Sequence, residues 1–210
     1  MKVICLSGAA RSGKDTAAQV LRDTFERRGK SVLVTHYADL LKYLCTTLFA
    51  WNGEKDEAGR SLLQHIGTDV VRKRNPNFWV DFLGEVLTMF AGKWDYVIIG
   101  DTRFPNEISR LKAVGLDVMH VRIHRDGLDS PLTSEQRGHE SETALDNVAP
   151  DYWIINYELE DFKKKVNSFG IELLASADDG VQLQIFDEII GGVTKVRHII
   201  NEDIGKRRPK

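Results

Sequence analysis

Nine consecutive residues near the amino terminus have the types and the spacing that bind a polyphosphate. They are Gly8-Ala9-Ala10-Arg11-Ser12-Gly13-Lys14-Asp15-Thr16, with the spacing G-x-x-x-x-G-K. The glycines allow successive backbone N–H groups to turn toward phosphate oxygens, and Lys14 can neutralise charge on a phosphoryl group during its transfer. We therefore expect an ATP site made by Gly8, Ala10, Arg11, Ser12, Gly13, Lys14, Asp15 and Thr16, with Lys14 also catalytic.

The residue after Lys14 departs from the usual Walker A pattern, in which a Ser or Thr hydroxyl binds magnesium. Here that position is Asp15, and Thr16 follows. Adenylate-kinase-like enzymes are similar in this respect. That resemblance implies that Thr16 contacts phosphate and that Mg²⁺ is bound by the nucleotide, water and a carboxylate elsewhere, with Asp15 a second metal candidate. The alternative is a glycine turn that only joins a strand to a helix.

A carboxylate and an arginine follow the apolar run Tyr96–Ile99, which is typical of a central parallel strand. Ligands gather beyond the carboxyl ends of such strands. Asp101 could hold Mg²⁺ through water or accept a proton, and Arg103 could bind a substrate phosphate with its forked guanidinium. We expect both to be catalytic, with Arg103 also binding substrate. The alternative is an Asp that caps the next helix and an Arg on its surface.

A polar stripe with a spacing of four residues suggests where the acceptor binds. It consists of Arg60, Gln64, Thr68 and Arg72, opposite the apolar Leu62, Ile66 and Val70. The arginines could bind charge and Gln64 could hydrogen-bond a base, although a solvated helix face has the same pattern. Asp39 and Lys42, in an earlier helix, are expected to border the same pocket.

Three arginines, Arg122, Arg125 and Arg137, flank or lie within the polar segment 125–143. Phosphoryl transfer needs positive charge around the transferred group and the exclusion of water, and a mobile arginine-bearing lid supplies both. We therefore expect a lid at about 125–143 with Arg125 catalytic. An ordinary surface loop is the alternative.

Strands that alternate with helices must position these residues. We expect strands over 2–6, 31–35, 96–99, 117–123 and 152–155, helices over 15–28, 39–49, 60–74, 78–90, 107–114 and 159–169, and a loop over 52–59. This order predicts a five-stranded parallel sheet with helices on both faces. Residues 1–169 form one domain, with acceptor-binding helices at about 38–92. Residues 170–210 form an extension of unknown role, in which 181–186 could be a strand.

The bulk composition gives little sign of a nucleic-acid or membrane partner. The formal net charge is −2, and no apolar run is long enough to span a bilayer. Cys5 and Cys45, the two cysteines, indicate neither a disulfide framework nor a zinc site. The phosphate loop begins too early to leave room for a signal peptide. We expect a cytoplasmic protein whose partners are small-molecule nucleotides, and the sequence leaves a homodimer open.

Several motifs along residues 1–169 resemble the bacteriophage-type deoxynucleoside monophosphate kinases. They are Ser7-Gly8 with Arg11-Ser12-Gly13-Lys14-Asp15-Thr16, Leu63-Gln64 with Gly67-Thr68-Asp69, Phe78-Trp79-Val80, Asp101-Thr102-Arg103 with Glu107, the 118–125 strand, His139 with Ser141-Glu142, and Asp151 with the residues 154–156. The resemblance implies the three-layer P-loop NTPase fold of nucleoside monophosphate kinases. It also implies ATP as phosphoryl donor, Mg²⁺, and a deoxynucleoside monophosphate acceptor that becomes a diphosphate.

The resemblance also implies roles for individual residues. Lys14 and Arg11 belong to the phosphate loop, and Arg125 belongs to the lid. The acceptor side would be lined by Gln64, Thr68, Asp101 and Arg103. We expect Glu142 there as well. If the chain is phage-encoded, its compartment is the host cytoplasm.

Part of the sequence is also similar to the animal-type phosphomevalonate kinases. The shared features are the Arg11–Asp15 loop, the Asp101–Arg103 strand end, and the segments around Glu140-Ser141-Glu142 and 145–154. Three other functions therefore stay open: a kinase for another acceptor such as phosphomevalonate, a kinase for a modified base in phage DNA, and a nucleotide-binding protein without catalysis. The 63–69 stretch favours the nucleotide kinases.

Overall fold

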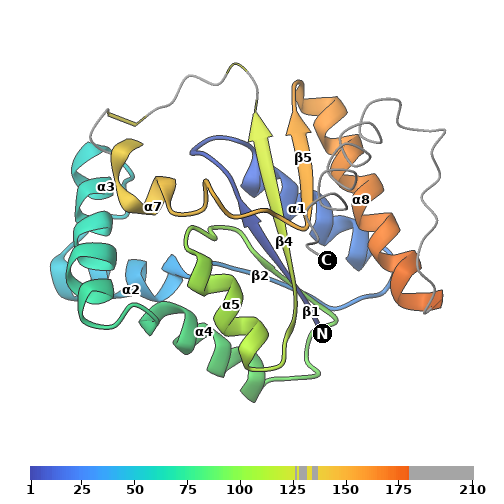
Figure 1. Cartoon of the computed structure of the whole chain (residues 1–210), viewed down its shortest axis with the longest axis horizontal. Coiled ribbons are helices and arrows are strands. Elements are labelled where there is room, and N and C mark those ends of the chain that lie inside the picture. The colour runs from blue at the N-terminus through green and yellow to red at the C-terminus, as the bar shows by residue number, and fades with distance from the viewer. Residues whose placement is uncertain (126, 128–131, 134–136, 180–210) are drawn as a thin grey trace, which may run out of the picture. The chain divides into compact units, whose positions relative to one another are not determined.

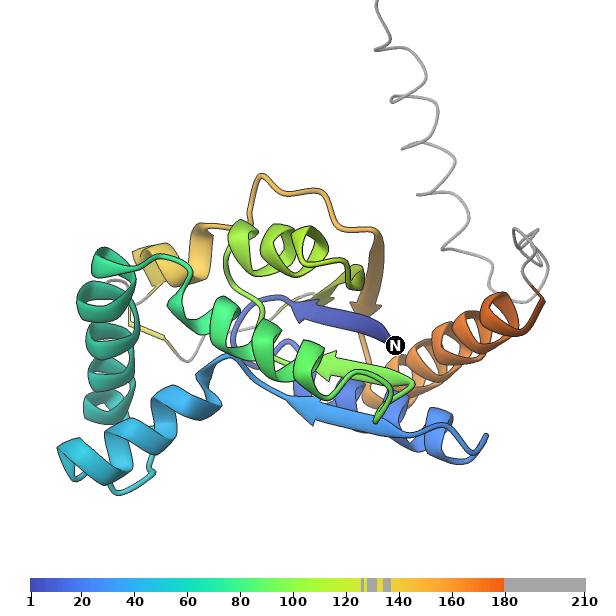
Figure 2. The same ribbon diagram turned by 90° about the horizontal axis from the view of Figure 1, so that it is seen from below.

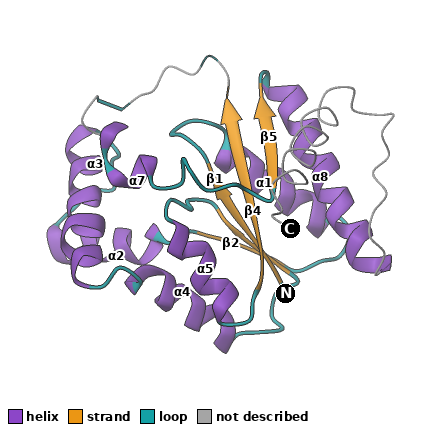
Figure 3. Ribbon diagram, in the orientation of Figure 1, coloured by secondary structure: helices purple, strands orange, loops and turns teal. Residues whose placement is uncertain are grey.

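Five parallel strands form a single sheet in the computed structural model, which describes residues 1–125, 127, 132–133 and 137–179 (Figures 1 and 3). They are β1 (Lys2–Ser7), β2 (Val32–Thr35), β3 (Tyr96–Ile99), β4 (Asp117–Arg125) and β5 (Tyr152–Asn156). Their spatial order is β2-β3-β1-β4-β5, with every neighbouring pair parallel. The carboxyl ends of all five therefore lie at one edge of the sheet.

Helices follow the strands in the order that a parallel sheet requires. They are α1 (Lys14–Glu26), α2 (Ala38–Phe49), α3 (Glu57–Gln64), the π-helix η1 (His65–Arg72), α4 (Phe78–Met89), α5 (Pro105–Ala113), α7 (Glu140–Thr143) and α8 (Leu159–Asp179). The chain divides into two compact units, Met1–Ile171 and Glu172–Lys210.

The two faces of the sheet are covered by different helices (Figure 2). On one face, Val3 and Cys5 of β1 pack in a core with residues of α4 and α5 such as Leu87 and Leu111. On the other face, α1 packs against the sheet, where the Phe25 ring stacks on Tyr96 at a centroid distance of 4.0 Å. Alternate strand residues point to opposite faces, so the continuous apolar run 3–6 of β1 is buried between two helical layers. The predicted three-layer α/β fold is confirmed.

The helical region between β2 and β3 differs from its prediction. Residues 57–59 were expected in a loop but belong to α3, which Asp56 caps by accepting the Gly59 N–H at 2.7 Å. The expected helix over 60–74 changes its winding at His65, where η1 begins. Because a π-helix places residues about five apart on one face, Val71 packs on the core beside Ile66, and the prediction of Val70 there was wrong.

Parts of the predicted lid and tail lie outside the described residues. In the lid, 126, 128–131 and 134–136 are not described, and α7 begins at Glu140. The helix predicted over 159–169 extends to Asp179, while the possible strand at 181–186 lies beyond the description. No helix in the described residues is both long and apolar enough to cross a membrane.

The first glycine of the phosphate loop lies against the backbone of β4. Gly8 has φ of 139°, and a Cβ added to it would lie 2.2 Å from the carbonyl oxygen of Ile123. A side chain at this position therefore meets both backbone strain and a rigid neighbour. The close approach brings the loop to the carboxyl end of β4, where Arg125 lies.

We predict that Gly8→Ala destabilises the protein and abolishes nucleotide binding. The left-handed backbone alone costs roughly 1–2 kcal/mol, and displacement of the loop from β4 adds about 1–3 kcal/mol. Thermal unfolding and titration with ADP would measure both effects. The matched control is Gly92→Ala, which has φ of 90° but meets nothing within 4 Å. Equal loss of stability in the two variants would show that the contact with Ile123 contributes nothing.

Candidate active site

The phosphate loop is held in a tight curl by its own backbone. Gly13 has φ of 112° and Arg11, although not a glycine, has φ of 63°. The Ser12 N–H donates to the Ala9 carbonyl at 3.1 Å, and Asn156 at the end of β5 donates from Nδ2 to the Ser12 carbonyl at 2.9 Å. Alternating backbone conformations of this kind turn N–H groups into an anion-binding concavity at the start of α1.

The Lys14 ammonium closes over the loop. Its Nζ donates to the carbonyl oxygens of Gly8 and Ala9, both at 2.8 Å. Burial, together with the nearby positive charge of Arg103, lowers the pKa of Lys14 to about 8. An ammonium has three N–H donors, so one remains for a phosphate oxygen while two are held by the loop. Lys14 is therefore a partly desolvated cation that an incoming anion would stabilise.

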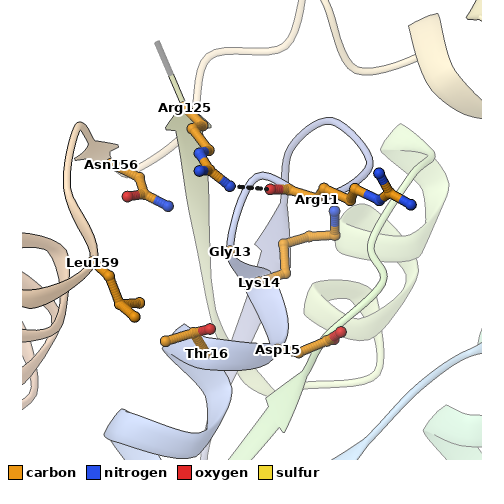
Figure 4. A pocket seen from close by; sticks show the side chains of 8 residues that line it. All are labelled: Arg11, Gly13, Lys14, Asp15, Thr16, Arg125, Asn156 and Leu159. Carbon is orange, nitrogen blue, oxygen red and sulfur yellow. Dashed lines mark hydrogen bonds between the residues drawn. The ribbon is translucent and has the colours of Figure 1, made fainter. Parts of the chain in front are cut away.

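One cavity of about 350 Å³ opens beside the loop (Figure 4). The residues that line it are Arg11, Gly13, Lys14, Asp15, Thr16, Arg125, Asn156 and Leu159. Arg125 comes from the end of β4 and donates from Nη1 to the Arg11 carbonyl at 3.4 Å. Sequence reasoning missed Asn156 and Leu159 as site residues, although the position of Asn156 at the end of the last strand was the available signal.

A second cavity of about 280 Å³ lies against the other half of the loop. Its lining includes Gly8, Ala9 and Ala10 from the loop and three arginines: Arg103 after β3, Arg122 within β4 and Arg137 after β4. Two of these cations already have acidic partners. Arg103 pairs with Glu142 of α7, and Arg122 donates to Asp146 at 2.8 Å. The structure thus brings together the predicted residues Arg103 and Glu142.

Asp101 holds the start of α2 rather than the next helix. Its Oδ1 accepts the Tyr37 N–H at 2.8 Å and its Oδ2 accepts the Ala38 N–H at 3.0 Å. The first N–H groups of a helix lack partners within the helix, so this carboxylate stabilises the amino terminus of α2. Both oxygens are engaged, and a role of Asp101 in proton or metal binding stays a prediction.

The residues of the polar stripe have different environments. Arg60, Gln64 and Thr68 are half-buried, and neither of the two cavities is lined by them. Arg72 is paired with the buried Glu107 of α5, and its guanidinium lies 3.8 Å from the centre of the Phe104 ring. Arg72 therefore has a structural environment, and substrate binding by these four residues stays a prediction.

The two residues expected at the border of the acceptor pocket pair with each other. Lys42 donates to Asp39 at 2.9 Å, and Asp39 also accepts the His36 N–H at 2.8 Å. Burial alone would raise the pKa of Asp39, but the hydrogen bond and charge of Lys42, with His36, lower it below its usual value. These contacts anchor the start of α2.

The donor set beside the loop suits magnesium only in combination with a nucleotide. The carboxylate of Asp15 and the hydroxyl of Thr16 line the first cavity. Mg²⁺ usually binds to one or two carboxylates together with substrate phosphates and several waters. No cluster of three or more His, Cys, Asp or Glu residues suited to a metal occurs in the described part of the chain. Asp15 fits the ion better than Asp101, whose oxygens already accept two amides.

A curled loop between β1 and α1, a desolvated lysine over it, and arginines at the ends of neighbouring strands define a P-loop phosphotransferase. The sequence model of deoxynucleotide monophosphate kinases matches residues 28–166. The chain belongs to the deoxynucleotide monophosphate kinase family. The matched region includes Asp101, Arg103, Arg125 and Glu142, whereas the phosphate loop precedes it.

Two relatives show how far the similarity extends. An uncharacterised protein, ORF77 of Ictalurid herpesvirus 1, is 29% identical over 168 residues, which are 79% of this chain and 69% of that protein. The deoxynucleotide monophosphate kinase of phage T4 is 36% identical over 72 residues, which are 33% of this chain and 30% of the phage enzyme. The chain thus matches less than a third of the length of the phage enzyme.

Solved structures with a similar fold are more distant. The APS kinase CysC of Mycobacterium tuberculosis has a TM-score of 0.48 at 17% identity, covering 83% of this chain and 97% of that chain. The thymidylate kinase of Ehrlichia chaffeensis has a TM-score of 0.46 at 15% identity, covering 83% and 98%.

We predict that nucleotide affinity falls as the pH rises above about 8. Lys14 binds phosphate as an ammonium, and its pKa is lowered to about 8 in the free protein. Bound phosphate raises that pKa, so affinity is nearly constant from pH 7 to 8 and decreases by up to about tenfold per pH unit above pH 8. Titration with ADP between pH 7 and 9.5 measures this, because the phosphate itself titrates near pH 6.

The control for this titration is Lys14→Arg, whose guanidinium stays protonated throughout the range. Its affinity for ADP should be weaker and independent of pH. The same decline above pH 8 in both proteins would exclude Lys14 as the titrating group.

Proposed function

We propose that the protein transfers the γ-phosphoryl group of ATP to a deoxynucleoside monophosphate and releases a deoxynucleoside diphosphate and ADP. The observation that carries the proposal is that one phosphate loop lines two cavities. Gly8, Ala9 and Ala10 line one, while Arg11 and the residues from Gly13 to Thr16 line the other. Each cavity also has arginines. Two anionic substrates can thus meet at the same backbone curl.

The cavity that holds Lys14, Asp15 and Thr16 suits the donor. Its anion-binding loop would bind the β- and γ-phosphates. Arg125 and Leu159 line the same cavity, and the flat face of the base could pack against them. Asp15, with Thr16, would hold Mg²⁺ against the phosphates, and the ion would neutralise charge there. Asn156 fixes the loop through the Ser12 carbonyl.

The cavity that holds Arg103 suits the phosphate of the acceptor. A guanidinium binds a phosphate bidentately, but here it is paired with Glu142 and also donates to the Ser141 carbonyl at 3.2 Å. The acceptor phosphate must therefore compete with Glu142 for Arg103. Membership of the deoxynucleotide kinase family favours a deoxynucleotide over phosphomevalonate as the acceptor.

The reaction itself requires charge and position more than covalent chemistry. An oxygen of the acceptor phosphate attacks the γ-phosphorus, and the bond to the β-phosphate oxygen breaks. Lys14 stabilises charge on the transferred group, while Arg103 and Arg125 hold the two substrates. Because Lys14 is partly desolvated, its charge acts more strongly than it would in water.

We predict ATP-dependent turnover with at least one of dAMP, dGMP, dCMP, dTMP and 5-hydroxymethyl-dCMP. Coupled detection of ADP, with identification of the diphosphate product, measures it. Lys14→Ala should lower kcat by at least about 1000-fold, since it removes charge from the transferred group, without loss of folding. Activity only with phosphomevalonate or DNA would overturn the acceptor assignment. Tight ATP binding without product from any acceptor would indicate a non-catalytic protein.

We further predict that two arginine variants separate the two substrates. Arg103→Ala should raise the KM of the deoxynucleotide at least about tenfold while leaving the affinity for ATP unchanged, because a charge-assisted hydrogen bond contributes about 1.5–3 kcal/mol. Arg125→Ala should weaken the affinity for ATP while leaving the KM of the deoxynucleotide unchanged. Steady-state kinetics with each substrate varied in turn measures both. The opposite pattern would show that ATP binds in the cavity of Arg103 and the deoxynucleotide in the cavity of Arg125.

A further inference from the structure

Glu107 is a buried carboxylate close to Arg103 and outside both cavities. It lies in the first turn of α5, and 2% of the residue is exposed. Burial raises the pKa of Glu107, while the charge of Arg72 and two backbone N–H groups oppose the shift. Burial of a carboxylate is unfavourable unless nearby groups compensate its charge, so the contacts of Glu107 reveal what it holds in place.

The side chain of Glu107 fixes the backbone that carries Arg103. Its Oε2 accepts the N–H of Arg103 at 2.7 Å and the N–H of Phe104 at 3.1 Å. These are orphan donors at the amino terminus of α5, and the carboxylate satisfies both. The backbone at Arg103, between β3 and α5, is thereby held in place.

The same carboxylate reaches the helices between β2 and β3. Its Oε1 pairs with Arg72, the last residue of η1, which also donates to the Pro76 carbonyl at 3.0 Å. Asn106, the neighbour of Glu107, donates to that carbonyl too, at 2.8 Å. Two contacts therefore tie the end of η1 to the start of α5.

The backbone of Glu107 adds a third link. Its carbonyl accepts the Tyr37 hydroxyl at 2.7 Å, and the N–H of Tyr37 donates to Asp101. Tyr37 is buried at the start of α2. Glu107 thus joins α2, η1 and the loop after β3, while its own side chain lines neither cavity.

We propose that Glu107 is a positioning residue that aims Arg103 at the acceptor phosphate and couples Arg103 to the helix η1 through Arg72. The inference rests on the proposed function, in which Arg103 binds that phosphate. An error of about 1 Å in such a group can cost about 100-fold in rate. Glu107 acts through Arg103 and does not touch the substrate.

Glu107→Gln tests the coupling with little change of shape. The amide oxygen can still accept the N–H groups of Arg103 and Phe104. The amide NH₂ then faces the guanidinium of Arg72, donor against donor, and the charge pair is lost. We expect kcat/KM for the best deoxynucleotide of the panel to fall up to about 100-fold, with ADP affinity unchanged.

The decisive comparison uses Arg103→Ala as the background. If Glu107 acts through Arg103, the substitution Glu107→Gln causes no further loss in the double variant. A purely structural role would instead give additive losses, or weaken ADP binding in parallel, and either result overturns the inference. An Arg103→Ala variant with normal acceptor kinetics would refute the proposed acceptor site itself, so the two failures are distinguishable.

Two further variants guard against misfolding. Arg72→Lys keeps the charge beside Glu107 but not the forked geometry, and replaces Glu107→Gln in the comparison if that protein does not fold. The matched control is Asp81→Asn. Asp81 of α4 forms an ion pair with Arg110, which lies on α5 as Glu107 does, at an N···O distance of 2.9 Å, and this pair is more exposed than the pair of Glu107 with Arg72. This control should keep full activity, and a comparable loss of kcat/KM in it would also overturn the inference.

Discussion

The structure depends on positive charge concentrated at the carboxyl edge of one parallel sheet. Four of these cations have partners within the chain: Lys14 donates to two loop carbonyls, while Arg103 pairs with Glu142, Arg122 with Asp146 and Arg72 with Glu107. Partly buried cations without partners would be unfavourable. Carbonyl and carboxylate oxygens of the chain therefore accept hydrogen bonds from these cations at the positions where phosphate oxygens could bind. The pairs differ in accessibility, since Arg103 is 41% exposed and Arg72 only 10%. Exchange of partners is therefore easier at Arg103, while Arg72 remains part of the framework.

The winding of the helix formed by α3 and η1 determines both where Arg72 lies and which residues pack in the core. Gly67 is buried where η1 crosses α2, and its carbonyl accepts the Trp79 indole N–H of α4 at 3.0 Å. The wider turns of η1 direct Val71 into the core and leave Arg72 at the end of the helix, next to Glu107. Both views place the short helix α7, which carries Glu142, beside this region (Figures 1 and 2). Helices far apart in sequence therefore meet near Arg103.

Local patterns sufficed where the chain folds on itself over short distances. The phosphate loop was predicted from the spacing of its glycines and lysine. The Tyr96–Ile99 strand was predicted with the bounds it has, because a short apolar run between turns is typical of a buried strand. Contacts between distant residues could not be predicted. Asp101 caps α2, whereas the alternative drawn from the sequence had it cap the next helix, and the partner of Arg72 lies 35 residues away. The π-winding of η1 depends on its neighbours as well, so a regular α-helical stripe was the natural but wrong expectation.

The order of the strands has a consequence for biosynthesis. β1 is made before the other four strands, yet its neighbours in the sheet are β3 and β4, and its loop is completed by contacts with Ile123 and Asn156. Pairings this distant in sequence form late and slowly, because a long chain must close before they contribute stability. A nascent chain on the ribosome thus cannot assemble its nucleotide pocket until β5, with Asn156, has emerged. Until β3 has emerged, β1 has no partner strand, and its apolar residues are exposed to aggregation.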